Sequence, residues 1–134
     1  MTNTEKLLQL VQENPELPIV PMVDYEVVDD GYGWWVGSFG RCSVGEYALF
    51  YERYFDDRGD FAEFYYDYND DELCERFNYD PRIHKYSVAQ GLYTKEQLEV
   101  NKANEKLLDE YIDKVADEYF KKAIIVYIGL PEEL

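Results

Sequence analysis

The sequence predicts a single α+β domain over residues 1–134, with an antiparallel sheet, an N-terminal helix, an acidic insertion at about 56–80, one long C-terminal helix and a final central strand. Residues 2–5 (TNTE) and 94–97 (TKEQ) are capping boxes, which mark helix starts. Residues 123–128 (AIIVYI) form an unbroken, largely β-branched apolar run, which is typical of a buried strand. The length agrees with one domain.

The first capping box predicts a short helix, because leucines and valines follow it at helical spacing. This helix should end before Asn14-Pro15, since the residue before a proline avoids helical dihedrals. The next stretch, PELPIVPMV, is extended, but its prolines confine it to a sheet edge or a connector.

Glycine-containing turns predict antiparallel pairing in the first half of the chain. The sequence DDGYG separates residues 25–28 from 34–39, and this pattern is typical of a hairpin. A second turn at Gly40-Arg41 leads to residues 43–55, which we interpret as one or two strands. These elements together predict an antiparallel meander.

The second half of the chain is predicted to be mainly helical. Asp60 should cap a helix over 61–68, and Asn69 or Asp70 should cap a second helix over 73–77. Asp80-Pro81 breaks the pattern, and residues 82–91 are expected to form an irregular connector. The second capping box starts a long helix to about residue 120, before the strand at 123–128, which Gly129 ends.

Negative charge is concentrated in residues 56–80. The chain has 29 acidic and 13 basic residues, a net charge of −16, and this segment has ten acidic and two basic residues, a net charge of −8. It also contains seven aromatic residues, whereas disordered acidic tails contain few. We therefore expect a folded array of carboxylates, formed by Asp56, Asp57, Asp60, Glu63, Asp67, Asp70, Asp71, Glu72, Glu75 and Asp80.

This charge argues against two classes of partner. Phosphates would be repelled, so the chain is not expected to bind DNA or RNA directly or to dock on an anionic membrane. No apolar run reaches the length of a membrane span. The two cysteines, Cys42 and Cys74, lack metal-binding spacing and fit a reducing, cytoplasmic environment.

The sequence gives little support for catalysis, so a non-enzymatic protein without a cofactor is expected. The single histidine, His84, lies between Arg82 and Lys85, which is typical of a surface residue rather than a general base. Neither cysteine has neighbours that would favour a reactive thiolate. A pair of carboxylates arranged for glycoside cleavage is left open, because sequence does not reveal that geometry.

A calcium loop is the nearest approach to a metal site. Residues 67–71 (DYNDD) resemble its first half, with oxygen ligands at positions one, three and five. Glu72 then stands where glycine is required, and Asn78 stands where the bidentate glutamate is required. No dedicated metal site is therefore predicted, and a metal-dependent enzyme is kept as a third alternative.

Aromatic side chains extend the candidate interface. Tyr65, Tyr66 and Tyr68 lie among the acids, where at least one should be exposed. Trp34-Trp35 follows the predicted hairpin turn, so strand alternation should bury one ring and expose the other as a binding hot spot. The predicted partner-binding residues are Asp29, Asp30, Trp34, Asp56, Asp57, Asp60, Glu63, Tyr65, Tyr66, Asp67, Tyr68, Asp70, Asp71, Glu72 and Glu75.

A second acidic stripe lies on the long helix. Asp109, Asp113 and Asp117 are one helical turn apart, and Lys106 and Lys114 dilute their charge. We interpret this stripe as a solvated helix face.

Residues 14–24 (NPELPIVPMVD), 29–32 (DDGY) and 35–40 (WVGSFG) resemble small acidic proteins encoded by phages and mobile elements of Gram-positive bacteria, and residues 123–131 fit that group. These proteins are similar in character to anti-CRISPR and antirestriction inhibitors, several of which imitate DNA. The resemblance implies an inhibitor of a basic nucleic-acid-binding protein, such as a CRISPR effector nuclease, in the cytoplasm of a host bacterial cell. The chain is expected to be a monomer or small homo-oligomer. The resemblance transfers no motif residue by residue.

Two alternative explanations of the dense negative charge in residues 56–80 involve no imitation of DNA. The charge could reflect surface drift or adaptation to salt. The chain could also be a structural or adaptor protein of a phage or mobile element that binds through an aromatic surface, with the charge serving solubility.

Overall fold

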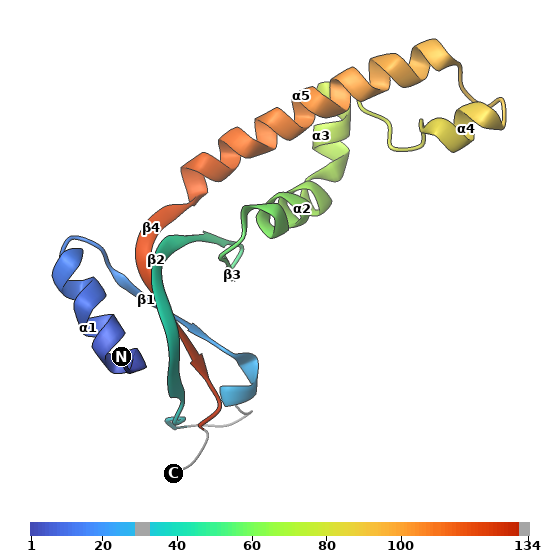
Figure 1. Ribbon diagram of the computed structural model, residues 1–134. Coiled ribbons are helices and arrows are strands. Elements are labelled where there is room, and N and C mark those ends of the chain that lie inside the picture. The colour runs from blue at the N-terminus through green and yellow to red at the C-terminus, as the bar shows by residue number, and fades with distance from the viewer. Residues whose placement is uncertain (29–32, 132–134) are drawn as a thin grey trace. The chain divides into compact units, whose positions relative to one another are not determined.

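The computed structural model describes residues 1–28 and 33–131, and in them it has an α+β fold (Figure 1). Four strands form one sheet in the order β1-β4-β2-β3, with the N-terminal helix and the long C-terminal helix as predicted. The predicted fold class, including a final central strand, is confirmed. The elements are α1 (Asn3–Glu13), β1 (Ile19–Val23), the 3-10 helix η1 (Tyr25–Val27), β2 (Ser38–Phe50), β3 (Arg53–Phe55), α2 (Arg58–Tyr68), α3 (Asp70–Phe77), α4 (Lys85–Ala89), α5 (Lys95–Tyr119) and β4 (Lys121–Gly129).

The chain divides into two compact units. Met1–Tyr47 and Phe120–Leu134 form the first, called here the strand unit. Ala48–Tyr119 form the second, called here the helical unit. The prediction of a single domain over 1–134 stays a prediction.

The strand unit is built around β4. Its residues 123–126 are buried, as the unbroken apolar run predicts. β1 pairs parallel with β4, in register Ile19 to Ile124, and β2 pairs antiparallel on the other side. Leu10 of α1 packs against Ile124 and Val126. β1 is an edge strand, as its prolines suggested, but the sheet is mixed rather than wholly antiparallel.

The predicted hairpin over 25–39 is wrong, whereas the interpretation of 43–55 as one or two strands is confirmed by the antiparallel pair β2 and β3. Residues 25–27 form η1, which begins where the Asp24 carboxylate accepts a hydrogen bond from the Glu26 N–H at 3.0 Å. The described residues 34–37 form no strand, and the turn residues 29–32 lie outside the described part of the chain. The expected turn at residues 40 and 41 is an irregularity within β2, between Phe39 and Cys42.

The helical unit begins with a tight β2–β3 hairpin, in which Phe50 pairs with Arg53. The cap of α2 is Asp57 rather than the predicted Asp60, because the Asp57 carboxylate accepts hydrogen bonds from the N–H groups of Gly59 and Asp60. α3 includes the predicted second helix over 73–77 but begins earlier, at Asp70, and its N-cap Asn69 makes no side-chain hydrogen bond to the helix.

The connector to α5 is more ordered than expected. It contains α4, whose first turn is capped by the His84 ring nitrogen Nδ1, the acceptor of a hydrogen bond from the Ser87 N–H at 3.2 Å. The predicted capping box of α5 is confirmed, since the Thr94 N–H donates to the Gln97 side chain at 2.8 Å and the Gln97 N–H donates to the Thr94 hydroxyl at 3.1 Å.

Candidate functional site

The acidic segment is folded into α2 and α3, which pack on α5 (Figure 1). Phe61 of α2 is fully buried among aromatic rings, including those of Phe50 and Phe55. Leu73 of α3 packs with Leu108 and Ile112 of α5. Burying a side chain of this size contributes about 1.5–3 kcal/mol, so several such contacts hold both helices in place.

The carboxylates of this segment point to solvent. Nine are exposed, namely Asp56, Asp57, Asp60, Glu63, Asp67, Asp70, Asp71, Glu72 and Glu75. The tenth, Asp80, is partly buried and pairs with Arg82 at 2.8 Å. Its hydrogen bonds with Arg82 lower the pKa of the Asp80 carboxyl.

Both arginines of the segment contact α5. Arg58 forms an ion pair with Asp117 at 2.6 Å, and Arg76 donates a hydrogen bond to the Tyr111 hydroxyl at 3.1 Å. The Arg76 guanidinium also lies over the Tyr111 ring, 4.5 Å from its centroid. The cations of α2 and α3 are therefore engaged within the unit.

The predicted tyrosines differ in exposure. Tyr65 and Tyr66 are partly buried, and Tyr66 lies 3.4 Å from the Cys74 sulfur through its hydroxyl. Tyr68 is exposed and stacks on Tyr51 with ring centroids 4.1 Å apart. Of the three, Tyr68 is therefore the one placed to contact a partner with its ring.

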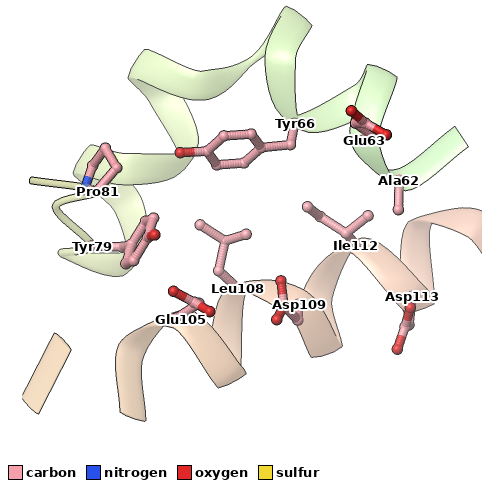
Figure 2. A pocket seen from close by; sticks show the side chains of 10 residues that line it. All are labelled: Ala62, Glu63, Tyr66, Tyr79, Pro81, Glu105, Leu108, Asp109, Ile112 and Asp113. Carbon is pink, nitrogen blue, oxygen red and sulfur yellow. The ribbon is translucent and has the colours of Figure 1, made fainter. Parts of the chain in front are cut away.

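A groove of about 470 Å³ lies between α2 and α5 (Figure 2). Its floor is mainly apolar and is formed by Ala62, Tyr66, Tyr79, Pro81, Leu108 and Ile112. Four carboxylates line it as well, those of Glu63 from α2 and of Glu105, Asp109 and Asp113 from α5. Among the described residues that line the groove, none is Lys or Arg.

The groove changes the ionisation of its own residues. Burial, followed by the charges of Glu105 and Asp113, raises the pKa of the Asp109 carboxyl. Burial, followed by a hydrogen bond with Glu105, raises the pKa of Tyr79 to about 12. In both cases burial is the main cause, and the neighbouring carboxylates add a smaller contribution that a nearby cation would offset.

Sequence reasoning missed the α5 side of this groove. Asp109 and Asp113 are exposed, as the interpretation of their stripe as a solvated face predicts, and they also lie beside Leu108 and Ile112 of the core. The available signal was the spacing of Glu105, Asp109 and Asp113 at i, i+4 and i+8, beside apolar residues with the same spacing.

Trp34, the tryptophan predicted to bind a partner, lies in the strand unit. Trp34 is 99% exposed, and Trp35 is 43% exposed, so the expected burial of one ring is wrong because these residues are not in a strand. A second hollow of about 300 Å³ is lined there by Val27, Trp34, Trp35, Phe39 and Ile128, among others. The predicted site residues Asp29 and Asp30 lie outside the described residues.

Within residues 1–28 and 33–131, no three His, Cys, Asp or Glu side chains are grouped so that they could hold a metal ion. None of the described helices combines the length and apolar character needed to cross a membrane. Comparison with models of known protein families, with curated proteins and with solved structures gives no significant match to this chain.

Proposed function

We propose that this protein is a non-enzymatic, anti-CRISPR-like inhibitor encoded by a phage or mobile element. It binds a basic nucleic-acid-binding protein of the host bacterial cytoplasm, such as a CRISPR effector nuclease, through an acidic face that imitates DNA. The observation that carries the proposal is the display of nine exposed carboxylates on and beside two helices that are anchored by a buried core.

The chemistry of the acidic face matches that of a phosphate backbone. Arginine and lysine side chains that normally hold phosphates form charge-assisted hydrogen bonds with carboxylates. Long-range attraction between surfaces of opposite charge accelerates their encounter. Ordered helices present these charges without the entropy that a disordered tail would lose on binding.

Competition with DNA tests this function. Purified CRISPR effector nucleases and restriction endonucleases are bound to fluorescent duplex DNA, and the full chain is added at about 0.1 M and about 0.5 M salt. We expect displacement of DNA from at least one basic nuclease, with an affinity that falls roughly tenfold or more at the higher salt.

Two variants with equal loss of charge make the test specific. Asp67→Asn, Asp71→Asn and Glu75→Gln together should weaken displacement roughly tenfold. Glu99→Gln, Glu110→Gln and Glu118→Gln, which are exposed on α5 and outside the groove, should weaken it less than about threefold. Equal losses in the two variants, or an affinity insensitive to salt, would contradict a DNA-mimicking face.

The exposed Trp34 favours one alternative, a structural or adaptor protein that binds through an aromatic surface. Val36 and Phe39 of the same unit are also exposed, by 60% and 55%. If this alternative holds, the triple variant at Asp67, Asp71 and Glu75 binds the partner protein as well as the unchanged chain does, whereas Trp34→Ala does not bind it.

A further inference from the structure

We infer that the groove between α2 and α5 binds a basic amphipathic helix of the partner protein, with apolar side chains on the groove floor and lysine or arginine beside the carboxylates. This inference rests on the proposed function and names the element of the partner that this part of the surface would take. It goes beyond imitation of DNA, because the groove would also take apolar side chains, which a phosphate backbone does not bind.

The shape of the groove suits apolar side chains at helical spacing. Leu108 and Ile112 rise from α5 toward α2 (Figure 2), but they are only 2% and 3% exposed, so the accessible apolar lining comes mainly from the partly buried Ala62, Tyr66 and Tyr79. From Glu105 to Asp113 the groove follows α5 for nine residues, a rise of about 12 Å or roughly two turns. A partner helix places its own anchors over a similar length, at i and i+4.

The volume is also in the range of binding sites. About 470 Å³ lies within the roughly 300–1,000 Å³ of small-molecule pockets, which is room for a few side chains of a partner helix. A mainly apolar floor with a few charged groups around it is the arrangement expected where apolar anchors give affinity and polar groups fix orientation.

The charge of the groove favours a basic helix of another protein over a second copy of this chain. Carboxylates come from both helices that bound the groove, Glu63 on α2 and three residues on α5, and no described lining residue is Lys or Arg. A second copy of this chain, with a net charge of −16, would be repelled. A helix with apolar and cationic faces satisfies both the floor and the carboxylates.

The ionisation of Asp109 provides an independent readout. Its pKa is raised in the free protein by burial and by the charges of Glu105 and Asp113. A lysine or arginine placed beside it would lower that pKa, because the charged form gains a partner.

Peptide binding to the full chain tests the inference. One probe is a peptide of about 14 residues with leucines at helical spacing and lysines elsewhere, and the second has serine in place of every leucine. In NMR titrations of the ¹⁵N-labelled protein we expect the leucine peptide to bind roughly tenfold tighter, to shift the amides of Ala62 and Ile112, and to lower the pKa of Asp109.

Matched variants locate the site. Glu63→Gln, Asp109→Asn and Asp113→Asn together should lower the affinity for the leucine peptide roughly tenfold. The control variant at Glu99, Glu110 and Glu118 should lower it less than about threefold. Glu105 is left intact because it bonds Tyr79. Equal binding of the two peptides, equal losses in the two variants or no binding at all would overturn the inference. If DNA displacement still depends on Asp67, Asp71 and Glu75, only the groove is lost and the proposed function stands.

Discussion

Asp109 illustrates how much of the candidate site depends on single side chains. The exposure of acids in α2 and α3 could be predicted from the sequence, because dense like charges cannot be buried together. The groove could not be predicted, because Glu63 and Asp109 are far apart in the sequence and meet only when α2 packs on α5. Local sequence patterns do not report contacts between helices that are far apart in the chain.

The raised pKa of Asp109 has a consequence for stability. In the unfolded chain its carboxyl ionises at the ordinary pKa, so the native state holds this proton more tightly. The stability linked to this group is therefore present below the unfolded pKa and is lost as the pH rises through the native one. We expect Asp109→Asn to stabilise the protein more at about pH 7 than at about pH 3, by less than about 1 kcal/mol because the side chain is partly solvated.

Urea unfolding at the two pH values measures this difference. Glu110→Gln, an exposed neighbour outside the groove, is the control and should change the pH profile less. A loss of stability in Asp109→Asn at neutral pH would contradict the assigned cause.

At the scale of elements, local signals predicted α1, α5 and β4 well. A capping box and a long apolar face determine α5, and an unbroken β-branched run determines β4. The predicted 25–39 hairpin failed because β1 and β2 both pair with β4, whose partner residues lie 74 to 105 positions further along the sequence. Glycine-containing turn signals cannot report such distant pairing.

The β2–β3 hairpin contains backbone strain that a substitution should relieve. Tyr51 and Glu52 form its two-residue loop with φ of 50° and 63°, a region that favours glycine. We expect Glu52→Gly to stabilise the protein by up to about 1 kcal/mol, since relief of strain exceeds the added freedom of the unfolded chain.

Thermal unfolding followed by circular dichroism measures this effect. Glu52→Ala removes the same carboxylate but keeps the Cβ, so it should give no comparable gain. Tyr51 is left unchanged because its ring stacks on Tyr68.

At the scale of the molecule, the charge and the candidate site belong mainly to one continuous segment. Residues 48–119 contain α2, α3, α5 and the groove, with 19 acidic and nine basic side chains. Their core of Phe61, Leu73, Leu108 and Ile112 is internal to that segment.

This organisation predicts that residues 48–119 fold as an isolated fragment. We expect helical circular dichroism and a cooperative thermal transition, because the buried Phe61, Leu73, Leu108 and Ile112 all lie within this unit. A fragment covering 1–47 alone should remain unfolded, since β4, the partner of both β1 and β2, is missing. A fragment 48–119 without a cooperative transition would instead favour one domain.

The position of β4 between β1 and β2 also sets an order of events on the ribosome. β1 and β2 emerge early in synthesis, but the strand that joins them is translated only after α5. The middle of the chain can therefore fold while the edges of β1 and β2 that pair with β4 are still unpaired. Those edges are the part of the nascent chain most exposed to aggregation or to chaperones.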